Sequence, residues 1–167
     1  MKHFFLVFSC LVMYSFAQAQ QTAEEYGIVI FNYIIQNNTQ LNKEFVDLVQ
    51  YTSYIDRLEK LPEEEREAIK LDATKSYAEV RQLFDLACTN ILNLYQSNTE
   101  LGATFIFLNS VFAKSKNFPD IGLVTCYYQA NIPGEEEPLE DAIVFECIKT
   151  GSGWRILDGF FDAPEIN

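Results

Sequence analysis

The sequence predicts an α+β protein in which the helices precede the strands along the chain. Between residues 22 and 96, apolar side chains recur mostly three or four positions apart, which is the spacing of a helix. Between residues 121 and 161, aromatic and β-branched runs alternate with turns that contain glycine and proline. We therefore expect one domain over 20–167, in which a long antiparallel helical hairpin (20–97) packs on an antiparallel β-meander of three or four strands (98–167).

The first helix is predicted to begin near Thr22. Thr22 is followed three residues later by Glu25, which fits a capping box in which each side chain binds the backbone N–H of the other residue. The dipeptide Asn37-Asn38 interrupts the helical pattern and indicates a kink or a break. The apolar stripe of this helix comprises Tyr26, Ile30, Ile34, Leu41, Phe45, Leu48, Ile55 and Leu58.

A second helix is predicted to begin after Leu61, because a residue before proline is pushed away from helical geometry. Pro62 suits the first turn of a helix, and the carboxylates of Glu63–Glu65 favour the positive end of the helix dipole. Each helix would span roughly 35 residues, or about 50 Å. The short connection predicts that the two helices are antiparallel. The second stripe comprises Ile69, Ala73, Tyr77, Val80, Phe84, Ala87, Ile91 and Leu94.

The predicted strands occupy the C-terminal part of the chain. Residues 103–112 form either a strand or a buried helix, since a short apolar run fits both. Strands are expected at 121–131, 142–149 and 154–161, with a polar loop over 132–140 and a glycine-rich turn before the last strand. The apolar face that we expect to pack on the helices includes Val124, Phe145, Trp154 and Ile156.

The N-terminal segment predicts export. Lys2 precedes an apolar run over residues 4–16, and Ala17-Gln18-Ala19 is a small-x-small cleavage site. This pattern is typical of a bacterial signal peptide over 1–19. We therefore expect cleavage near Ala19 and a secreted protein, either periplasmic or extracellular.

Two alternatives for this segment are less favoured. An uncleaved anchor would need roughly 20 apolar residues, and the run is shorter than that. A lipoprotein signal would lipidate Cys10, but Phe8 stands where such signals usually carry a small residue. We expect no membrane span after cleavage.

The charge of the chain excludes one class of partner. The sequence has 24 acidic and 12 basic residues, a formal net charge of −12, and it becomes one unit more negative when Lys2 leaves with the signal peptide. Such a surface repels phosphate backbones, so we expect no nucleic-acid partner. The acidity serves either solubility or the binding of a basic protein or a cation.

Loss of the signal peptide would also remove His3, the only histidine. A chain without imidazole lacks the base of a serine triad and the ligand that most zinc sites use. No phosphate-binding glycine loop is present either. We expect no cofactor, no metal and no catalytic residue.

Three cysteines lie beyond the signal peptide. Cys88 falls on the second helix and is interpreted as a small buried apolar residue. Cys126 and Cys147 lie on strands joined by one loop, nearly symmetric about its centre. A disulfide between them is a hypothesis that depends on the strand register.

Carboxylates gather near the predicted loop at Glu135–Glu137, Glu140 and Asp141. Calcium prefers oxygen ligands, but the spacing of a calcium-binding loop is missing, so a solvated loop is the simpler interpretation. Glu146 and Asp158 lie within strands and are interpreted as solvent-facing. Asp158 has the alternative of lining a pocket mouth.

Adjacent aromatic residues indicate a contact surface. In Tyr127-Tyr128 and in Phe160-Phe161, alternation along a strand turns one ring of each pair away from the core. The residues that we predict to contact a ligand or partner are Tyr127, Tyr128, Trp154, Asp158 and Phe160.

The C-terminal hairpin carries a resemblance. The strand 142–149, the glycine turn and the strand Trp154–Phe160 resemble the last hairpin of NTF2-like and cystatin-like secreted domains. The resemblance implies helices packed against a curved antiparallel sheet, with a ligand or partner bound in the cone between them.

The sequence thus predicts a secreted, non-enzymatic binding module for a small apolar ligand or a protein. One alternative is an exported inhibitor or immunity-type protein whose acidic face meets a basic partner. The other is an NTF2-like enzyme that works with carboxylates alone. A pocket enclosing a carboxylate of raised pKa, such as Asp158 or Glu146, would favour the enzyme.

Overall fold

The computed structural model describes residues 21–118 and 120–162. The predicted signal peptide (1–19), with His3 and Cys10, lies outside the described residues. The expected α+β class is confirmed, because the described helices all precede the strands. The helices are α2 (Ala23–Ile35), the 3-10 helix η1 (Thr39–Lys43), α3 (Leu48–Asp56) and α4 (Glu63–Glu100). The strands are β1 (Thr104–Lys114), β2 (Ile121–Asn131), β3 (Leu139–Thr150) and β4 (Gly153–Asp162).

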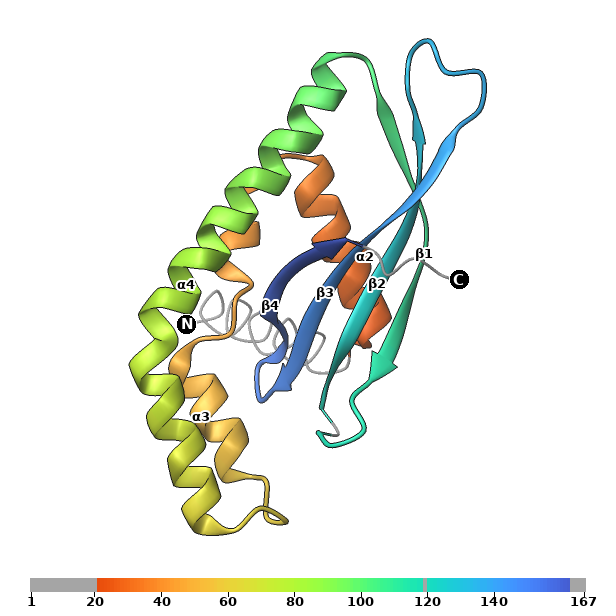
Figure 1. The fold of residues 1–167 in the computed structure, drawn as a ribbon. Helices are drawn as coiled ribbons and strands as arrows, with labels where there is room; N and C mark the ends of the chain where they lie inside the picture. Colours follow the sequence, from red (N-terminus) through yellow and green to blue (C-terminus); the bar gives the residue numbers. More distant parts are fainter. Residues whose placement is uncertain (1–20, 119, 163–167) are drawn as a thin grey trace, which may run out of the picture.

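The strands form one sheet in the order β1-β2-β3-β4, and each neighbouring pair is antiparallel. The segment 103–112, for which the sequence allowed a strand or a helix, lies mostly in strand β1 at one edge of the sheet. In Figure 1, α2 lies across one face of the sheet and the long α4 runs along the side of β4. The helices therefore cover one face and leave much of the other open.

The prediction of a long first helix is wrong. α2 does begin with the predicted capping box: the Thr22 N–H donates to Glu25 Oε2 at 2.9 Å, and the Glu25 N–H donates to Thr22 Oγ1 at 3.1 Å. The helix ends at Ile35 because Asn37 adopts a φ of 50°. Asparagine tolerates this left-handed conformation better than most residues do. The dipeptide that we interpreted as a kink or a break is a break.

The chain then passes along the edge of the sheet before α3 begins. The Val46 N–H donates to the Ile156 carbonyl, and the Ile156 N–H donates to the Glu44 carbonyl, both at 2.8 Å. These two bonds add a short parallel bridge outside β4. A second capping box, formed by Asp47 and Gln50, starts α3.

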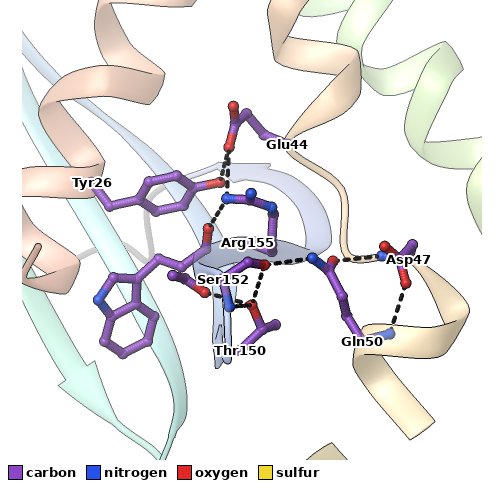
Figure 2. Close-up of polar contacts among 9 residues, drawn as sticks. Tyr26, Glu44, Asp47, Gln50, Thr150, Ser152 and Arg155 are labelled. Atoms are coloured by element: carbon purple, nitrogen blue, oxygen red, sulfur yellow. Dashed lines mark hydrogen bonds and ion pairs between the residues drawn. The ribbon is translucent and has the colours of Figure 1, made fainter. Parts of the chain in front are cut away.

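Figure 2 shows the polar network that fastens this passage. The Tyr26 hydroxyl donates to Glu44 Oε2 at 3.0 Å, and Arg155 Nη1 lies 3.6 Å from the same oxygen. Gln50 Nε2 donates to Ser152 Oγ at 2.7 Å, which ties the start of α3 to the β3–β4 turn. The members of this network satisfy one another, so its role is to hold α2, α3 and the sheet together.

The prediction of the second long helix is confirmed, although α4 continues to Glu100, so the predicted boundary at 97/98 falls inside it. Its 38 residues correspond to about 57 Å. None of the helices in the described part of the chain is both long and apolar enough to span a membrane. The buried residues of α4 are Phe84, Cys88, Leu92 and Tyr95.

That buried stripe shares only Phe84 with the predicted one, since Ile69, Ala73 and Tyr77 are partly buried and Val80 is 38% exposed. Ala87 and Ile91 are only partly buried, and Leu94 is 58% exposed. These three residues lie next to the face of α4 that contacts the rest of the protein, because the helix packs through Cys88, Leu92 and Tyr95 instead. An apolar strip of α4 is therefore left without cover.

The predicted core face of the sheet is confirmed. The close approach of α2 explains one glycine: a Cβ on Gly27 would lie 2.9 Å from Val124 Cγ1 and 3.0 Å from Cys126 Sγ. Any larger residue there would push the helix off β2. The predicted face residues that are buried are Val124, Phe145, Trp154 and Ile156.

Candidate ligand-binding cavity

A cavity of about 640 Å³ lies between the C-terminal half of α4 and the helix-covered face of the sheet. Its volume lies within the usual range for small-molecule sites. We call it the tyrosine cavity. It is lined by Ala87, Asn90, Ile91, Leu94, Tyr95, Asn98, Ala103, Phe105, Tyr128, Ala130, Ile132, Leu139, Asp141, Ala142, Ile143 and Phe160.

A chain of hydrogen bonds crosses this cavity. The Tyr95 hydroxyl donates to the Tyr128 hydroxyl at 2.7 Å, and the Tyr128 hydroxyl donates to Asp141 Oδ2 at 2.9 Å. The other carboxylate oxygen of Asp141 accepts the Ala142 N–H at 2.7 Å. Tyr95 and Tyr128 are only 6% and 5% exposed, whereas Asp141 is open to solvent. The relay therefore runs from the buried side of α4 to a carboxylate at the cavity mouth.

Strand pairing and helix periodicity create this relay. Tyr128 lies opposite Asp141 in the β2–β3 ladder, so both side chains leave the same face of the sheet. Tyr95 belongs to the buried stripe of α4, three residues after Leu92. The relay exists because the position of α4 brings the Tyr95 side chain to the Tyr128 side chain of β2.

Burial controls the protonation of both phenols. The pKa of Tyr95 is raised to about 12, chiefly by burial; the hydrogen bond with Tyr128 opposes this rise and the charge of Asp141 adds to it. Burial raises the pKa of Tyr128 further still, aided by the hydrogen bond with Tyr95 and by Asp141. Both hydroxyls keep their protons at neutral pH, so they act as fixed hydrogen-bond groups and not as bases.

Aromatic rings make the inner wall rigid. The Tyr95 ring centroid lies 4.8 Å from that of Phe105 and 5.8 Å from that of Tyr128. Phe105 and Tyr128 are 6.0 Å apart in an edge-on arrangement. Rings at these distances and angles attract one another, so the wall has a defined shape before any ligand arrives.

The structure divides the residues that we predicted as contacts. Tyr128 and Phe160 line the tyrosine cavity. Tyr127 is half-buried and takes the alternate side of β2, as the sequence pattern indicated for this pair. The side chain of Phe161 lies outside the described part, so its orientation stays a prediction.

The other two predicted contacts do not line the cavity. Trp154 is buried, stacks edge-on against Phe112 at 5.2 Å, and donates its indole N–H to the Gln21 carbonyl at 2.9 Å. Asp158 is exposed and accepts the N–H of Gly159 at 2.7 Å. Both have local structural partners.

The hypothesis of a disulfide between Cys126 and Cys147 is wrong. Cys126 lies opposite Ile143, and Cys147 lies opposite Gly122, so the two thiols are on different rungs of the β2–β3 ladder. Cys88, Cys126 and Cys147 are free and buried. Burial raises the pKa of the Cys88 and Cys126 thiols to about 12, so neither is an activated nucleophile.

The carboxylates are distributed differently from the sequence grouping. Asp141, which we had grouped with the acidic loop, faces the cavity, while Glu135–Glu137 are exposed. Burial, together with the charge of Asp158, raises the pKa of Glu146. Glu146 does not line the tyrosine cavity.

A second hollow of about 420 Å³ lies at the other end of α4, between its N-terminal half, α3 and β4. We call it the α3 cleft. There, the Tyr77 hydroxyl donates to the Val46 carbonyl at 3.3 Å, and the Ser76 hydroxyl donates to the Asp72 carbonyl at 3.1 Å. The α3 cleft is lined by Phe45, Val46, Tyr51, Ala68, Ile69, Asp72, Ala73, Ser76, Tyr77, Val80 and Leu157.

No known family model matches the chain, and neither a curated protein nor a solved structure matches it. The resemblance of the C-terminal hairpin to NTF2-like and cystatin-like domains stays a prediction. The described residues form an α+β domain with an aromatic cavity that has a carboxylate at its mouth. We infer the function from that cavity.

Proposed function

We propose that this protein is a non-enzymatic binding module that takes a small, largely apolar molecule into the tyrosine cavity. The single observation that carries the proposal is the composition of the cavity. Apolar and aromatic side chains surround one connected polar group, the Tyr95–Tyr128–Asp141 relay. This combination of an apolar wall with a few convergent polar atoms is typical of ligand sites.

Exposed apolar side chains around the mouth support this proposal. Leu94 is 58% exposed and Leu139 is 51% exposed, and both line the cavity. Burying apolar surface yields about 25 cal/mol for each Å² removed from water. A ligand that covers these side chains would gain that energy without a large rearrangement of the protein.

The chemistry of the lining supports binding over catalysis. The two phenols stay protonated near neutral pH, since burial raises the pKa of both Tyr95 and Tyr128. Glu146 and Asp158, the carboxylates that the sequence singled out for an enzyme, do not line the cavity, and Asp141, which does, is exposed. The signal-like segment 1–19 supports the proposal that this binding takes place after export.

Fluorescence titration with N-phenyl-1-naphthylamine, a neutral apolar dye, tests the proposal. We expect saturable binding with one site per chain. The variant Ala87→Trp places a large side chain into the cavity from α4 and should weaken dye binding by about tenfold or more. The matched control is Ala78→Trp, on the same helix, because Ala78 is exposed and lines neither hollow.

Two results would contradict the proposal. One is the absence of saturable dye binding to a folded wild-type protein. The other is equal dye affinity in the two tryptophan variants, which would place the dye somewhere other than the tyrosine cavity. Thermal unfolding of both variants shows whether the substitutions leave the fold intact.

A further inference from the structure

The polar atoms of the Tyr95–Tyr128–Asp141 relay accept hydrogen bonds more readily than they donate them. The Tyr95 hydroxyl hydrogen is used on Tyr128, and the Tyr128 hydroxyl hydrogen is used on Asp141. The relay therefore offers a ligand the lone pairs of Tyr95 and of the Asp141 carboxylate, while the amides of Asn90 and Asn98 elsewhere in the lining can both donate and accept. An ionised carboxylate accepts up to about four hydrogen bonds, and Asp141 uses two within the protein. A ligand group that is complementary to the relay must therefore bring the donors.

The charge of the cavity points in the same direction. Among the described residues that line it, none is a lysine, an arginine or a histidine. The ion pairs in the described part of the chain do not include Asp141. The carboxylate thus carries a negative charge at the mouth of an apolar cavity with no cation beside it. The formal net charge of −12 strengthens this field.

We propose that the ligand is an apolar monocation, with an ammonium-type nitrogen at one end and an aliphatic or aromatic body at the other. This inference rests on the proposed function and assigns the chemical class of the ligand. The charged head would meet Asp141, and the body would lie against Ile91, Leu94 and Phe160. The aromatic faces of Tyr95 and Phe105 add a favourable environment for a cation.

Other ligand charges fit the cavity less well. An anion such as a fatty-acid carboxylate would place a like charge against Asp141, and like charges repel. A neutral ligand without a hydrogen-bond donor would cover the carboxylate without replacing the water that solvates it, which costs free energy. A positively charged donor offsets that loss most strongly, because it adds the attraction between opposite charges to the hydrogen bond.

Displacement of the bound dye by three ligands of equal chain length tests this inference. Decylammonium, 1-decanol and decanoate differ only in the head group, and each is used below its micelle concentration at pH 7 in 0.15 M NaCl. We expect decylammonium to displace the dye at a concentration about tenfold lower than decanol, with decanoate the weakest. In Asp141→Asn the ratio between decylammonium and decanol should fall to about threefold or less.

The matched control is Glu140→Gln. Glu140 is exposed, precedes Asp141 in β3 and does not line the cavity, but its replacement removes the same unit of charge. We expect this variant to keep the preference for decylammonium. A preference lost equally in both variants would show a general attraction of cations to an acidic surface and would overturn the inference.

The result with wild-type protein separates the two proposals without relying on a variant that folds. Displacement by decanol or decanoate at the same concentration as decylammonium would overturn the cation inference while leaving an apolar binding site in place. Failure of the dye and of all three ligands to bind would overturn the proposed function itself.

Discussion

The two hollows along α4 have similar walls but use their hydroxyl groups differently. In the tyrosine cavity, the Tyr95 hydroxyl donates to the Tyr128 hydroxyl, which donates to the carboxylate of Asp141. This carboxylate is exposed to solvent. In the α3 cleft, Tyr77 and Ser76 spend their hydroxyl hydrogens on backbone carbonyls. The tyrosine cavity therefore has a negatively charged group at its solvent-exposed end, whereas the Tyr77 bond in the α3 cleft joins α4 to the segment before α3.

This difference shows that apolar volume alone does not define a binding site. Both hollows carry tyrosines and an aspartate, because Asp72 lines the α3 cleft. No side chain among the described residues donates a hydrogen bond to the Asp72 carboxylate. Its position is therefore not held by a tyrosine relay. The two hollows along α4 therefore differ in that the polar side chains of the tyrosine cavity are hydrogen-bonded to one another.

The largest effect that we expect is a loss of stability at alkaline pH. Burial raises the pKa of Cys88 and Cys126 from 9.0 to about 12 and that of Tyr95 from 10.0 to about 12. The unfolded chain releases these protons from about pH 9 upward, while the folded chain holds them to about pH 12. Stability is thus fully present below pH 9 and falls across pH 9–12. Each group costs about 1.4 kcal/mol for each pH unit in its window.

Urea denaturation at pH 8, 9, 10 and 11 measures this loss. Cys88→Ser removes the buried thiol of α4, so it should make the free energy of unfolding depend less steeply on pH above pH 9. A free energy of unfolding that stays constant from pH 8 to 11 would contradict the expectation. An unchanged slope in Cys88→Ser would show that another group dominates the loss.

A smaller effect compares one hydroxyl from each hollow. Tyr128→Phe removes the centre of the relay and leaves the buried Tyr95 hydroxyl without its acceptor, at a cost of about 1–3 kcal/mol. Tyr77→Phe removes a single long bond to the Val46 carbonyl and should cost about 1 kcal/mol or less. The free energy of unfolding in urea measures both. Equal losses would mean that the relay contributes no more than an ordinary hydrogen bond.

The smallest effect tests whether the α3 end loosens independently of the tyrosine cavity. Gln50→Ala removes half of the capping box of α3 and the bond to Ser152 (Figure 2). These hydrogen bonds are exposed to solvent, so we expect a loss of about 0.5–1 kcal/mol. Dye affinity at the tyrosine cavity should stay the same. A clear drop in dye affinity would show that the two ends of α4 are coupled.

The sequence predicts the fold where local signals decide it. The capping box at Thr22, the start of α4 and the positions of β2, β3 and β4 follow from short-range patterns. The first helix was mispredicted because Leu41, Phe45 and Ile55 are apolar and buried although they belong to separate segments. Leu41 and Phe45 pack into one core cluster, and Ile55 packs into a second. The capping box of Asp47 and Gln50 is the signal that would have placed the start of α3.

The candidate site was only partly predictable. Tyr128 and Phe160, which we predicted as contacts, line the tyrosine cavity, because the face of a strand follows from periodicity. That they contact a ligand stays a prediction. Tyr95 and Asp141 were missed because their meeting depends on the β2–β3 register and on how far α4 extends over the sheet. The disulfide hypothesis failed for the same reason, since the identity of the residues on two strands does not determine which residues lie opposite each other.

The order of the strands has a consequence for how the chain folds. Each strand pairs with its neighbour in sequence, so the sheet forms through short-range contacts, which favour fast assembly. α2 depends on distant partners: the Ser110 hydroxyl donates to the Glu24 carbonyl across 86 positions. In a chain synthesised from its N-terminus, α2 emerges before the other described helices, yet it acquires its packing surface only after β1 and β2 exist. Of the helices in the described residues, the first to be made is therefore among the last to pack.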